Sequence, residues 1–346
     1  MRTNAPLVSI VVPVYNGAPY LWASLGSIVA QTYPNVEVLV MDDASTDATP
    51  GIVASFGSRV RHHRQERNRG QFDNVNDGIA RARGSYVAVF HADDLYDPRI
   101  VEKEVDFLER HPEAGAVFAQ DVFIDPSGRP FGRLRLPADV PPGRPLDYPQ
   151  LLNALLRHMN RFLRTPGGMV RASVYRDIGP YRPEFGTSAD LQMWVRIARR
   201  YPIAILGEHL FRYRTGHGNA SGTYNHVRTE PDTSFEILDS CLVEGGRGLA
   251  SAAALRDYEA HRAEDGLMCA ISAYIRGDLD KARLRLRAVR PTRLLASRQV
   301  QRGRLLALLA ALHLLARLPI LPPLATLFYR RWHTKHPAAA STAGTS

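Results

Sequence analysis

The stretch from Ser85 to Tyr96 constrains the fold of this chain more than any other feature of its sequence. The residues from Tyr86 to Phe90 are aromatic or aliphatic without a polar break, and His91, Asp93 and Asp94 follow almost at once. Such a run is typical of a strand that is buried on both faces of a parallel sheet. Because ligands bind at the carboxyl edge of such sheets, we expect these polar side chains to lie at a binding site.

Two interpretations of these carboxylates are open at this point. Carboxylates so close together repel one another, and a bound cation would relieve that repulsion. Alternatively, Asp93 or Asp94 caps a helix that begins near Asp97 and Pro98, and no ligand is involved. Other features of the sequence are needed to decide whether these carboxylates form a cation-binding site or cap a helix.

Composition and charge narrow the classes of protein to consider. A chain of 346 residues can form one large domain with an appendage, or two domains. Its formal net charge of +10 favours an anionic partner, such as nucleotide phosphates, nucleic acid or an acidic membrane face. Cys241 and Cys269 have no metal-ligand spacing, and the first apolar run lacks the features of a secretory signal. We therefore expect a reducing, cytoplasmic location.

Other apolar runs also end in polar turns. The run from Val8 to Val14 leads into Tyr15 and Asn16, and the run from Val36 to Met41 leads into two aspartates. Further strands are predicted at 59–64, 116–124 and 202–210, and helices at 18–30, 74–82, 98–110 and 151–163. Residues 126–149 and 165–169 are predicted to be loop and turn. This alternation predicts an α/β fold with a mostly parallel sheet and helices on both faces.

The segment from Ser188 to Arg199 has helical spacing of its apolar residues and places Asp190 in the first helical turn. The helix dipole would keep a carboxylate there ionised, which suits a general base but equally suits a stabilising charge. Trp194 falls on the apolar stripe, so we expect it in the core. A loop rich in arginine, histidine and glycine follows at 211–221, where phosphates could bind.

Six short motifs in this order resemble those of the family 2 glycosyltransferases, which have the GT-A fold. The motifs span roughly the first 220 residues. They are Val8–Asn16, Met41–Asp47, Asn68–Gly70, Ala80–Tyr86 with His91–Asp94, Ala189–Arg196, and Tyr213–Arg214 with His217. The resemblance implies a GT-A catalytic domain over 1–230, which leaves a helical region at 231–335 and a disordered tail at 336–346.

The resemblance implies a site for the nucleotide of a nucleoside-diphosphate sugar, with a UDP-sugar favoured. Pro13, Val14 and Tyr15 would line the nucleobase pocket, and Asp43 would accept a hydrogen bond from the base. Arg69 would lie near the nucleotide. The full set of implied donor residues is Pro13, Val14, Tyr15, Asn16, Asp43, Arg69, His91 and Asp93.

The family holds a divalent metal, Mn²⁺ or Mg²⁺, with an Asp-x-Asp motif, and the chain departs from that motif. It reads His91-Ala92-Asp93, so Asp93 matches the metal-binding carboxylate and His91 replaces the first aspartate. A neutral imidazole brings no charge, and Mn²⁺ tolerates a nitrogen neighbour better than Mg²⁺ does. The implied metal ligands are Asp93 and His217.

The resemblance further implies an inverting transfer. Asp190 matches the catalytic base, and Arg214 and His217 match a loop on the diphosphate and acceptor side. The acceptor would be a hydroxyl of a saccharide or of a lipid-linked molecule, in cell-surface polysaccharide or glycolipid assembly. Because His91 breaks the metal motif, the alternative is a weak or inactive nucleotide-sugar-binding protein of the same fold.

Two other classes of protein fit the sequence less well. A Rossmann oxidoreductase needs Gly-x-Gly-x-x-Gly after its first strand, and residues 16–20 read Asn-Gly-Ala-Pro-Tyr. No helix-turn-helix, zinc or RNP-like pattern accompanies the arginines, so we expect no nucleic-acid partner.

The last third of the chain is predicted to be helical. Helices at 257–276 and 280–289 flank the turn Arg276-Gly277-Asp278, and residues 305–316 are almost wholly Leu and Ala. That last helix is too short for a clean bilayer span. It could pack on the catalytic domain, or residues 303–332 could attach in the plane of a membrane, with Tyr329 and Trp332 at the interface. Membrane attachment would place the protein at the inner face of the cell membrane.

Overall fold

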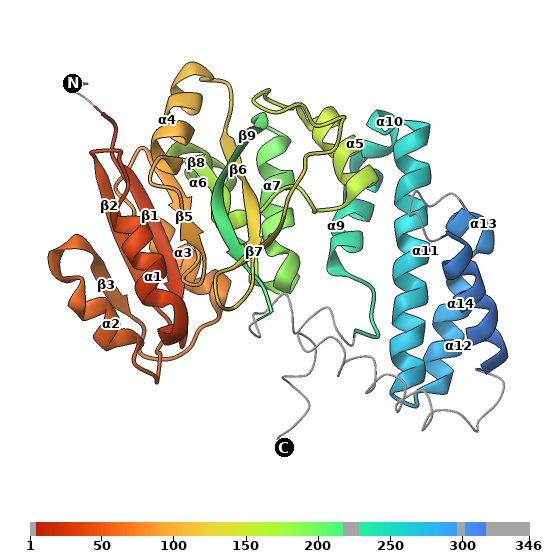
Figure 1. The fold of residues 1–346 in the computed structure, drawn as a ribbon. Coiled ribbons are helices and arrows are strands. Elements are labelled where there is room, and N and C mark those ends of the chain that lie inside the picture. Colours follow the sequence, from red (N-terminus) through yellow and green to blue (C-terminus); the bar gives the residue numbers. More distant parts are fainter. Residues whose placement is uncertain (1–4, 217–227, 296–301, 316–346) are drawn as a thin grey trace. The chain divides into compact units, whose positions relative to one another are not determined.

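The computed structural model describes residues 5–216, 228–295 and 302–315, which fall into two compact units (Figure 1). The first unit comprises residues 1–151 and 160–214, and the second comprises 152–159 and 215–346. The predicted ligand His217, the membrane-interface residues Tyr329 and Trp332, and the tail at 336–346 lie outside the described residues.

The first unit is built on a nine-stranded sheet with the order β3-β2-β1-β4-β8-β6-β9-β5, and β7 pairs with β6. The strands at the β3 end are parallel, because β1 pairs in parallel with both β2 and β4 and β2 pairs in parallel with β3. In chain order the strands are β1 (Val8–Val14), β2 (Val36–Asp42), β3 (Arg61–Arg64), β4 (Tyr86–Val89), β5 (Leu95–Tyr96), β6 (Ala116–Ile124), β7 (Pro130–Arg133), β8 (Gly168–Arg171) and β9 (Ile203–Arg214).

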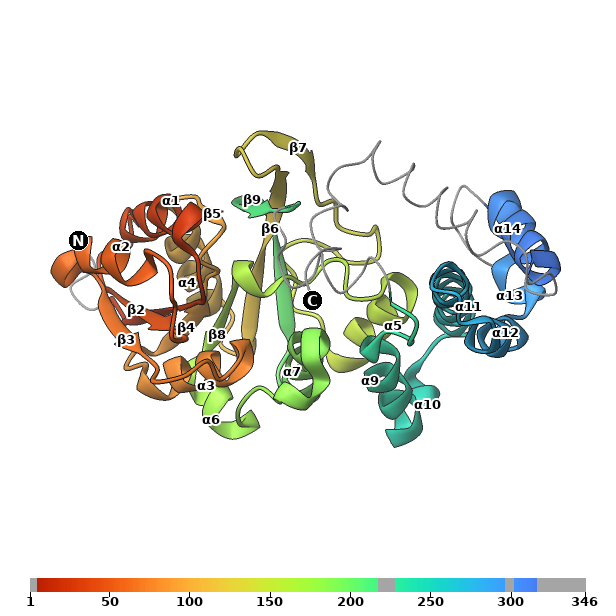
Figure 2. The ribbon, with the colours of Figure 1, turned by 90° about the horizontal axis from the view of Figure 1, so that it is seen from below.

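Helices cover both faces of this sheet (Figure 2). Helices α1 (Ala18–Val29), α2 (Thr49–Ser55) and α4 (Ile100–Arg110) pack on one face, where their buried residues join those of β1 in one apolar cluster. Helices α3 (Gln71–Arg81), α6 (Ala172–Ile178) and α7 (Ala189–Ala198) lie on the other face. Burial on both faces explains the unbroken apolar runs of β1, β2 and β4, and the predicted α/β class is confirmed.

The sheet is less regular in its second half than the sequence predicts. Strand β8 is antiparallel to both β4 and β6, and it lies where only a turn was expected. The chain at the start of β8 lies so close to neighbouring side chains that only glycine fits there. A Cβ atom at Gly168 would lie 2.6 Å from the Phe118 ring, and one at Gly167 would lie 2.2 Å from the Phe211 ring. Two glycines therefore resemble a turn in the sequence while they serve close packing between strands.

Three other boundaries differ from the predictions. Strand β9 extends to Arg214, so the expected loop at 211–214 is strand paired with β6. The predicted loop at 126–149 contains β7, and the helix predicted at 151–163 is α5 (Tyr148–His158). For β9, pairing with the distant strand β6 outweighs the local preference of its last residues for a loop.

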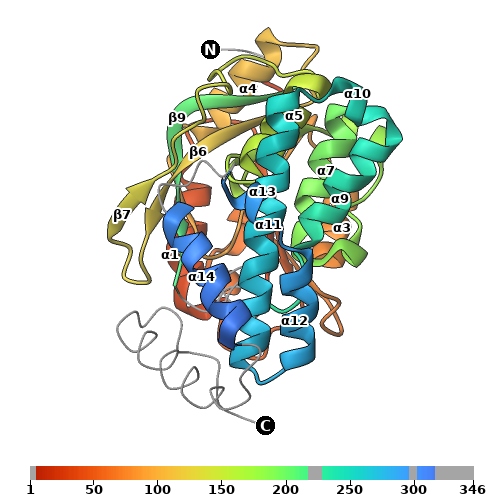
Figure 3. The same ribbon diagram turned by 90° about the vertical axis from the view of Figure 1, so that its right-hand side faces the viewer.

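The second unit is helical (Figure 3). Its helices are α9 (Thr233–Cys241), α10 (Arg247–Leu249), α11 (Ala252–Ile275), α12 (Leu279–Ala288), α13 (Pro291–Leu295) and α14 (Arg302–Leu315). The predicted hairpin at 276–278 is confirmed, and the Asp278 side chain caps α12 by accepting a hydrogen bond from the Lys281 N–H. Cys241 and Cys269 are buried and free.

Residues 152–159 of α5 belong to this helical unit. The Asn153 side chain donates to the Leu249 carbonyl at 2.9 Å and accepts from the Ser251 N–H at 2.8 Å. Arg157 pairs with Asp257 at 3.4 Å, and its carbonyl lies 2.9 Å from the His261 ring. A short segment from the middle of the chain is thus fixed to helices that follow it by about a hundred positions.

Helix α14 packs within the helical unit. Leu309 and Leu312 are buried in a cluster with residues of α11, α12 and α13, while Leu308 and Leu314 are exposed. Across the described ranges, no helix combines the length and the apolarity needed to cross a bilayer.

Candidate active site

The loops after β1 and β2 are tied to each other at the carboxyl edge of the sheet. Asn16 adopts a left-handed conformation with φ of 50°, which asparagine tolerates well. Its N–H donates to Ser45 Oγ at 3.0 Å, and its Oδ1 accepts from the Thr46 N–H at 2.8 Å. Pro13 and Val14 end strand β1, and Tyr15 next to them is 52% exposed. The exposed ring of Tyr15 therefore lies at the carboxyl edge of the sheet, next to backbone that these hydrogen bonds keep in place.

Asp43 links the β2 loop to the Asn68–Gly70 turn. It is buried, and its two carboxylate oxygens accept hydrogen bonds from the Arg69 N–H at 2.8 Å and the Gly70 N–H at 2.9 Å. Its own N–H donates to the Val14 carbonyl at 2.8 Å. The predicted nucleotide residues after β1, β2 and β3 are therefore brought together, and Asp43 orders the turn that carries Arg69.

His91, Asp93 and Asp94 form a cluster whose ligand atoms all lie within 4.8 Å of one another. Asp94 is fully buried, and its Oδ1 accepts a hydrogen bond from the Arg214 N–H at 2.8 Å. Helix α4 has Arg99 at its N-cap, without a side-chain capping bond. The alternative that Asp93 or Asp94 merely caps this helix is therefore wrong.

The electrostatics of this cluster suit a cation. Burial lowers the pKa of His91, so its ring is neutral at pH 7. Burial, together with the charge of Asp93, raises the pKa of Asp94 well above its ordinary value. His91 Nε2 and Asp94 Oδ2 are buried and find no hydrogen-bond partner in the described part of the chain. A divalent ion would satisfy both atoms, and a mixed nitrogen and oxygen set suits Mn²⁺ better than Mg²⁺.

Tyr96 supports this cluster from below. Its hydroxyl accepts a hydrogen bond from the His91 N–H at 2.6 Å, and its ring stacks on Phe90 with a centroid distance of 3.9 Å. Tyr96 lies in the stretch that the sequence singles out, but no role was predicted for it, because a tyrosine in a two-residue strand gives no pattern that marks it.

Arg214 connects three segments of the chain through one guanidinium group. It is 4% exposed, and its Nε donates to the Asp93 carbonyl at 2.8 Å. Its Nη1 donates to the carbonyls of Asp125 at 3.1 Å and Pro126 at 3.0 Å, and the group lies 4.5 Å from the centre of the Tyr20 ring. The guanidinium thus connects the start of α1, the segment of His91 to Asp94 and the loop after β6.

Asp190 lies in the first turn of α7, as predicted. Its Oδ1 accepts from the Leu191 N–H at 2.6 Å, and its Oδ2 accepts from the Thr165 hydroxyl at 3.3 Å. Burial raises its pKa to about 6, so desolvation outweighs the helix dipole that was expected to keep it ionised. A carboxylate with this pKa is ionised at neutral pH and can still accept a proton. Trp194 is buried between Phe118 and Tyr181, as predicted.

Neighbouring residues of β9 lie between Asp190 and the cluster of His91, Asp93 and Asp94. Arg214 contacts Asp93 and Asp94. The guanidinium of Arg164 lies over the ring of Tyr213, 4.7 Å from the centre of that ring. Thr165, the residue after Arg164, donates to Asp190. The end of β9 therefore lies between the two groups. Arg164 and Thr165 were missed because their segment resembles a turn in the sequence.

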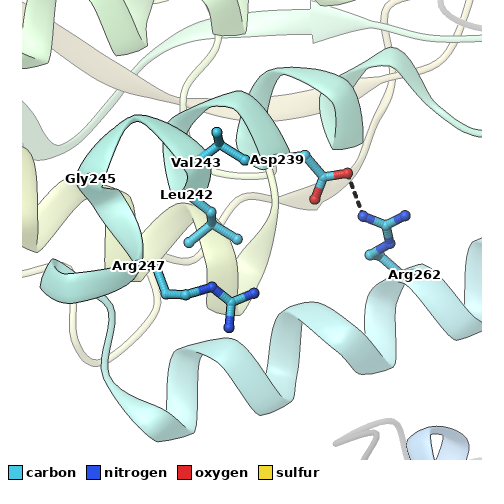
Figure 4. A pocket seen from close by; sticks show the side chains of 6 residues that line it. All are labelled: Asp239, Leu242, Val243, Gly245, Arg247 and Arg262. Atoms are coloured by element: carbon cyan, nitrogen blue, oxygen red, sulfur yellow. Dashed lines mark hydrogen bonds and ion pairs between the residues drawn. The ribbon is translucent and has the colours of Figure 1, made fainter.

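A separate pocket of about 610 Å³ lies in the helical unit. An ion pair between Asp239 and Arg262 lies at its wall, and Arg247 reaches into it (Figure 4). Leu242, Val243 and Gly245, which lie where α9 gives way to an irregular turn, complete its lining. None of these six residues matches one of the motifs in the first 220 residues.

Two comparisons with known proteins bear on the family to which this chain belongs. The family model described as Glycosyl transferase family 2 matches residues 9–179. A Haemophilus influenzae protein named as an uncharacterized glycosyltransferase is 30% identical over 233 residues, which make up 66% of this chain and 71% of that protein. This chain belongs to glycosyl transferase family 2. The family predicted from the sequence motifs is thereby confirmed.

Other members of family 2 differ from this chain in length. A Rickettsia felis protein named as an uncharacterized glycosyltransferase is 30% identical over 206 residues, which make up 59% of this chain and 33% of that protein. The chain thus spans about a third of the length of that relative.

Solved structures share the fold with this family 2 member. Staphylococcus aureus TarS residues 1–349, in complex with UDP-GlcNAc, superpose with a TM-score of 0.61 at 17% identity, over 94% of this chain and 92% of that one. The mannosyltransferase PcManGT from Pyrobaculum calidifontis, in complex with GDP-Man and Mn²⁺, gives 0.53 at 20% identity, over 97% and 86%.

Proposed function

We propose that this chain is an inverting glycosyltransferase that moves a sugar from a nucleoside-diphosphate sugar to a hydroxyl of a saccharide or lipid-linked acceptor. One observation carries the proposal. A half-buried carboxylate with a pKa of about 6, that of Asp190, is linked through the end of β9 to the cluster of His91, Asp93 and Asp94. A base and a candidate cation site on one framework are what sugar transfer from a diphosphate donor requires.

The donor would bind along the edge of β1, β2 and β4. Tyr15 would offer an aromatic face to the nucleobase, and the loop of Arg69 and Gly70, ordered by Asp43, would lie beside the nucleotide. TarS and PcManGT were solved with UDP-GlcNAc and GDP-Man, which supports a nucleotide-sugar donor. Of these bases we favour uridine.

A divalent metal would be held by Asp93 and His91, with Asp94 behind them, and by His217 as the family resemblance implies. When bound, it neutralises charge on the departing diphosphate. Arg214 would keep this motif in shape through the Asp93 carbonyl, and its positive charge would favour the anionic donor.

Asp190 would act on the acceptor. Its carboxylate takes a proton from the acceptor hydroxyl, whose oxygen attacks the anomeric carbon from the face opposite the diphosphate. The bond from the anomeric carbon to the diphosphate oxygen breaks as the new glycosidic bond forms. A single displacement of this kind inverts the anomeric configuration.

The acceptor and its location belong to the same proposal. The exposed Leu308 and Leu314 on α14 give the helical unit an apolar face next to a basic sequence. Such a face fits peripheral contact with an anionic membrane, where lipid-linked acceptors for polysaccharide or glycolipid assembly are found. We therefore place the protein on the cytoplasmic side of the cell membrane.

Asp190→Asn tests the proposal, with Glu184→Gln on the preceding exposed segment as the matched control. Transfer from a panel of nucleotide sugars with Mn²⁺ should fall by roughly 10²- to 10⁴-fold in Asp190→Asn, while donor binding by calorimetry stays near that of the parent. Transfer at the parent rate would make Asp190 a structural charge. Donor binding without transfer in the parent itself would support the alternative of an inactive nucleotide-sugar-binding protein.

A further inference from the structure

The neighbouring strands β7, β6 and β9 carry a row of three aromatic side chains (Figure 2). Phe123 of β6 lies opposite Tyr213 of β9 in the strand register. Phe131 of β7 stacks on Phe123, with 6.0 Å between the ring centres and 24° between the ring planes. The residue of β7 that pairs with Phe123 is Gly132, which has no side chain to cover its ring. Because Phe131 is itself 64% exposed, the β7 end of the row offers an aromatic surface to a ligand.

The guanidinium of Arg164 gives this row a polar side. It lies 5.4 Å from the ring centre of Phe123 and 4.7 Å from that of Tyr213. Its Nε lies 3.1 Å from Oδ2 of Asp121, which is fully buried in β6, so the ion pair and the two rings hold the group in place. Among the described residues, Asp121 is the one polar partner of this side chain, which is 27% exposed. Its Nη groups can therefore donate hydrogen bonds to a ligand.

The row lies next to the candidate active site. Arg164 precedes Thr165, whose hydroxyl donates to Asp190 Oδ2 at 3.3 Å. On the other side, Arg214 donates to two carbonyls of the loop between β6 and β7, at 3.0 and 3.1 Å, and also to the carbonyl of Asp93. The strands that carry the aromatic row are thus linked to the segments of the proposed base and of the candidate cation cluster.

The chemistry of this surface matches a sugar ring. A pyranose presents C–H groups on one face, which pack against an aromatic ring, and hydroxyl groups at its edge, which accept hydrogen bonds from a guanidinium. A lipid chain would cover the rings equally well, but it would bury the N–H groups of Arg164 without an acceptor, which costs free energy. The presence of Arg164 beside the exposed ring therefore favours a saccharide as the occupant.

We propose that Phe131, Phe123 and Arg164 form a subsite for a sugar ring of a saccharide acceptor, one hydroxyl of which reaches Asp190. The ring packs against the phenylalanines, and Arg164 donates to its hydroxyl groups. This inference rests on the proposed function, and it narrows the acceptor to a saccharide. All three residues lie outside the motifs of the sequence analysis.

Saturation-transfer NMR tests the subsite without any need for transfer. The full chain is mixed with UDP, Mn²⁺ and one of four disaccharides (maltose, cellobiose, lactose or chitobiose), and the aromatic protons of the protein are irradiated. The C–H protons of at least one disaccharide should receive saturation, and its Kd from titration should rise about tenfold in Phe131→Ala. Phe131→Tyr, which retains the ring, should keep the parental Kd. Trp22→Ala removes an exposed ring on α1 and should also leave the Kd unchanged.

Arg164→Lys tests the polar side of the subsite. The lysine retains a cation beside Asp121, so the fold should persist, but it lacks the planar fork that donates to neighbouring hydroxyls. The Kd for the disaccharide should rise in this variant as well. In transfer assays, Phe131→Ala should raise the KM for the acceptor about tenfold, while hydrolysis of the nucleotide sugar by water stays at the parental rate.

Three results would overturn the inference. The first is equal saccharide affinity in Phe131→Ala and the parent, and the second is the absence of saturation in every disaccharide with the parent. The third is that Phe131→Ala no longer sediments with phosphatidylglycerol vesicles, as the parent does, yet binds saccharides normally, because the exposed ring would then contact lipid. If disaccharides bind through Phe131 but the parent neither transfers nor hydrolyses any nucleotide sugar, the subsite stands and the proposed function fails.

Discussion

The two sides of the candidate site are built in different ways. On the proposed donor side, the loops after β1 and β2 bind each other and the Arg69 turn through backbone N–H groups and short side chains. On the proposed acceptor side, Asp190 accepts a hydrogen bond from Thr165, and Arg164, the residue before Thr165, contacts Asp121 on β6 and Tyr213 on β9. The proposed donor side is thus formed by the adjacent ends of neighbouring strands. The proposed acceptor side is formed by side chains from segments that are far apart in the sequence.

This difference determines what a mutation can do on each side. Where neighbouring loops hold one another, a single substitution leaves most contacts in place. Where one side chain links several segments, its removal takes away contacts from all of them at once. Four substitutions follow, from the largest expected effect to the smallest. The first three test whether this contrast is real, and the fourth concerns Glu104, which lies in α4 and on neither side.

Arg214→Ala should be the most damaging change. It removes a buried guanidinium that binds three backbone carbonyls, and it leaves those oxygens without their donor. We expect the free energy of unfolding to fall by about 3 kcal/mol or more, measured by urea denaturation. Arg212→Ala, two positions earlier on the same strand and exposed, is the control. A loss below about 1 kcal/mol would mean that Arg214 is not the link between these segments.

Asp93→Ala should come next and should act on binding more than on stability. Without this carboxylate the cluster loses a charged oxygen, and donor affinity measured by calorimetry with Mn²⁺ should weaken by about 10- to 100-fold. Asp97→Asn, whose carboxylate binds its near neighbour Arg99, serves as the control. Equal donor affinity in Asp93→Ala and the parent would remove Asp93 from the site.

Asp43→Asn should have a moderate effect. One of the two N–H groups of the Arg69 turn then faces an amide in place of an oxygen, which should cost about 1–2 kcal/mol of unfolding free energy. Because the loops also bind each other directly, the fold should persist, and the nucleotide affinity should report the looser turn. The exposed Glu66→Gln change controls for loss of negative charge. A loss as large as that in Arg214→Ala would break the contrast between the two sides.

Glu104→Gln should have the smallest effect, visible mainly in its pH dependence. Glu104 is fully buried in α4, neither oxygen finds a partner among the described residues, and burial raises its pKa well above 4.5. The folded state therefore binds a proton that the unfolded state releases, and this stability is lost as pH rises above 4.5. Urea denaturation between about pH 5 and 8 should show a shallower decline in Glu104→Gln than in the parent. Glu102→Gln, exposed on the same helix, should keep the parental slope.

The sequence predicts which polar residues stand at the ends of the strands, and it does not predict the contacts around Asp190, for the same physical reason. Buried parallel strands have unbroken apolar runs in the sequence, so the polar residues that follow them, such as Asp43 and Asp93, are easily recognised. Arg164 and Tyr96 make their contacts with segments that come together only on folding. Gly167 and Gly168 predict a turn in the sequence, although Gly168 begins strand β8. The raised pKa of Asp190 likewise follows from burial that periodicity does not reveal.

The placement of residues 152–159 within the helical unit has a practical consequence for anyone who divides this molecule. The chain leaves the sheet unit, returns to it and leaves again, so no single cut separates the two parts. A fragment that stops after Arg214 would retain the helix of Asn153 and Arg157 but lose its partners Ser251, Asp257 and His261. Isolating the sheet unit therefore requires replacing that internal helix as well, and recombination between relatives would have to exchange both pieces together.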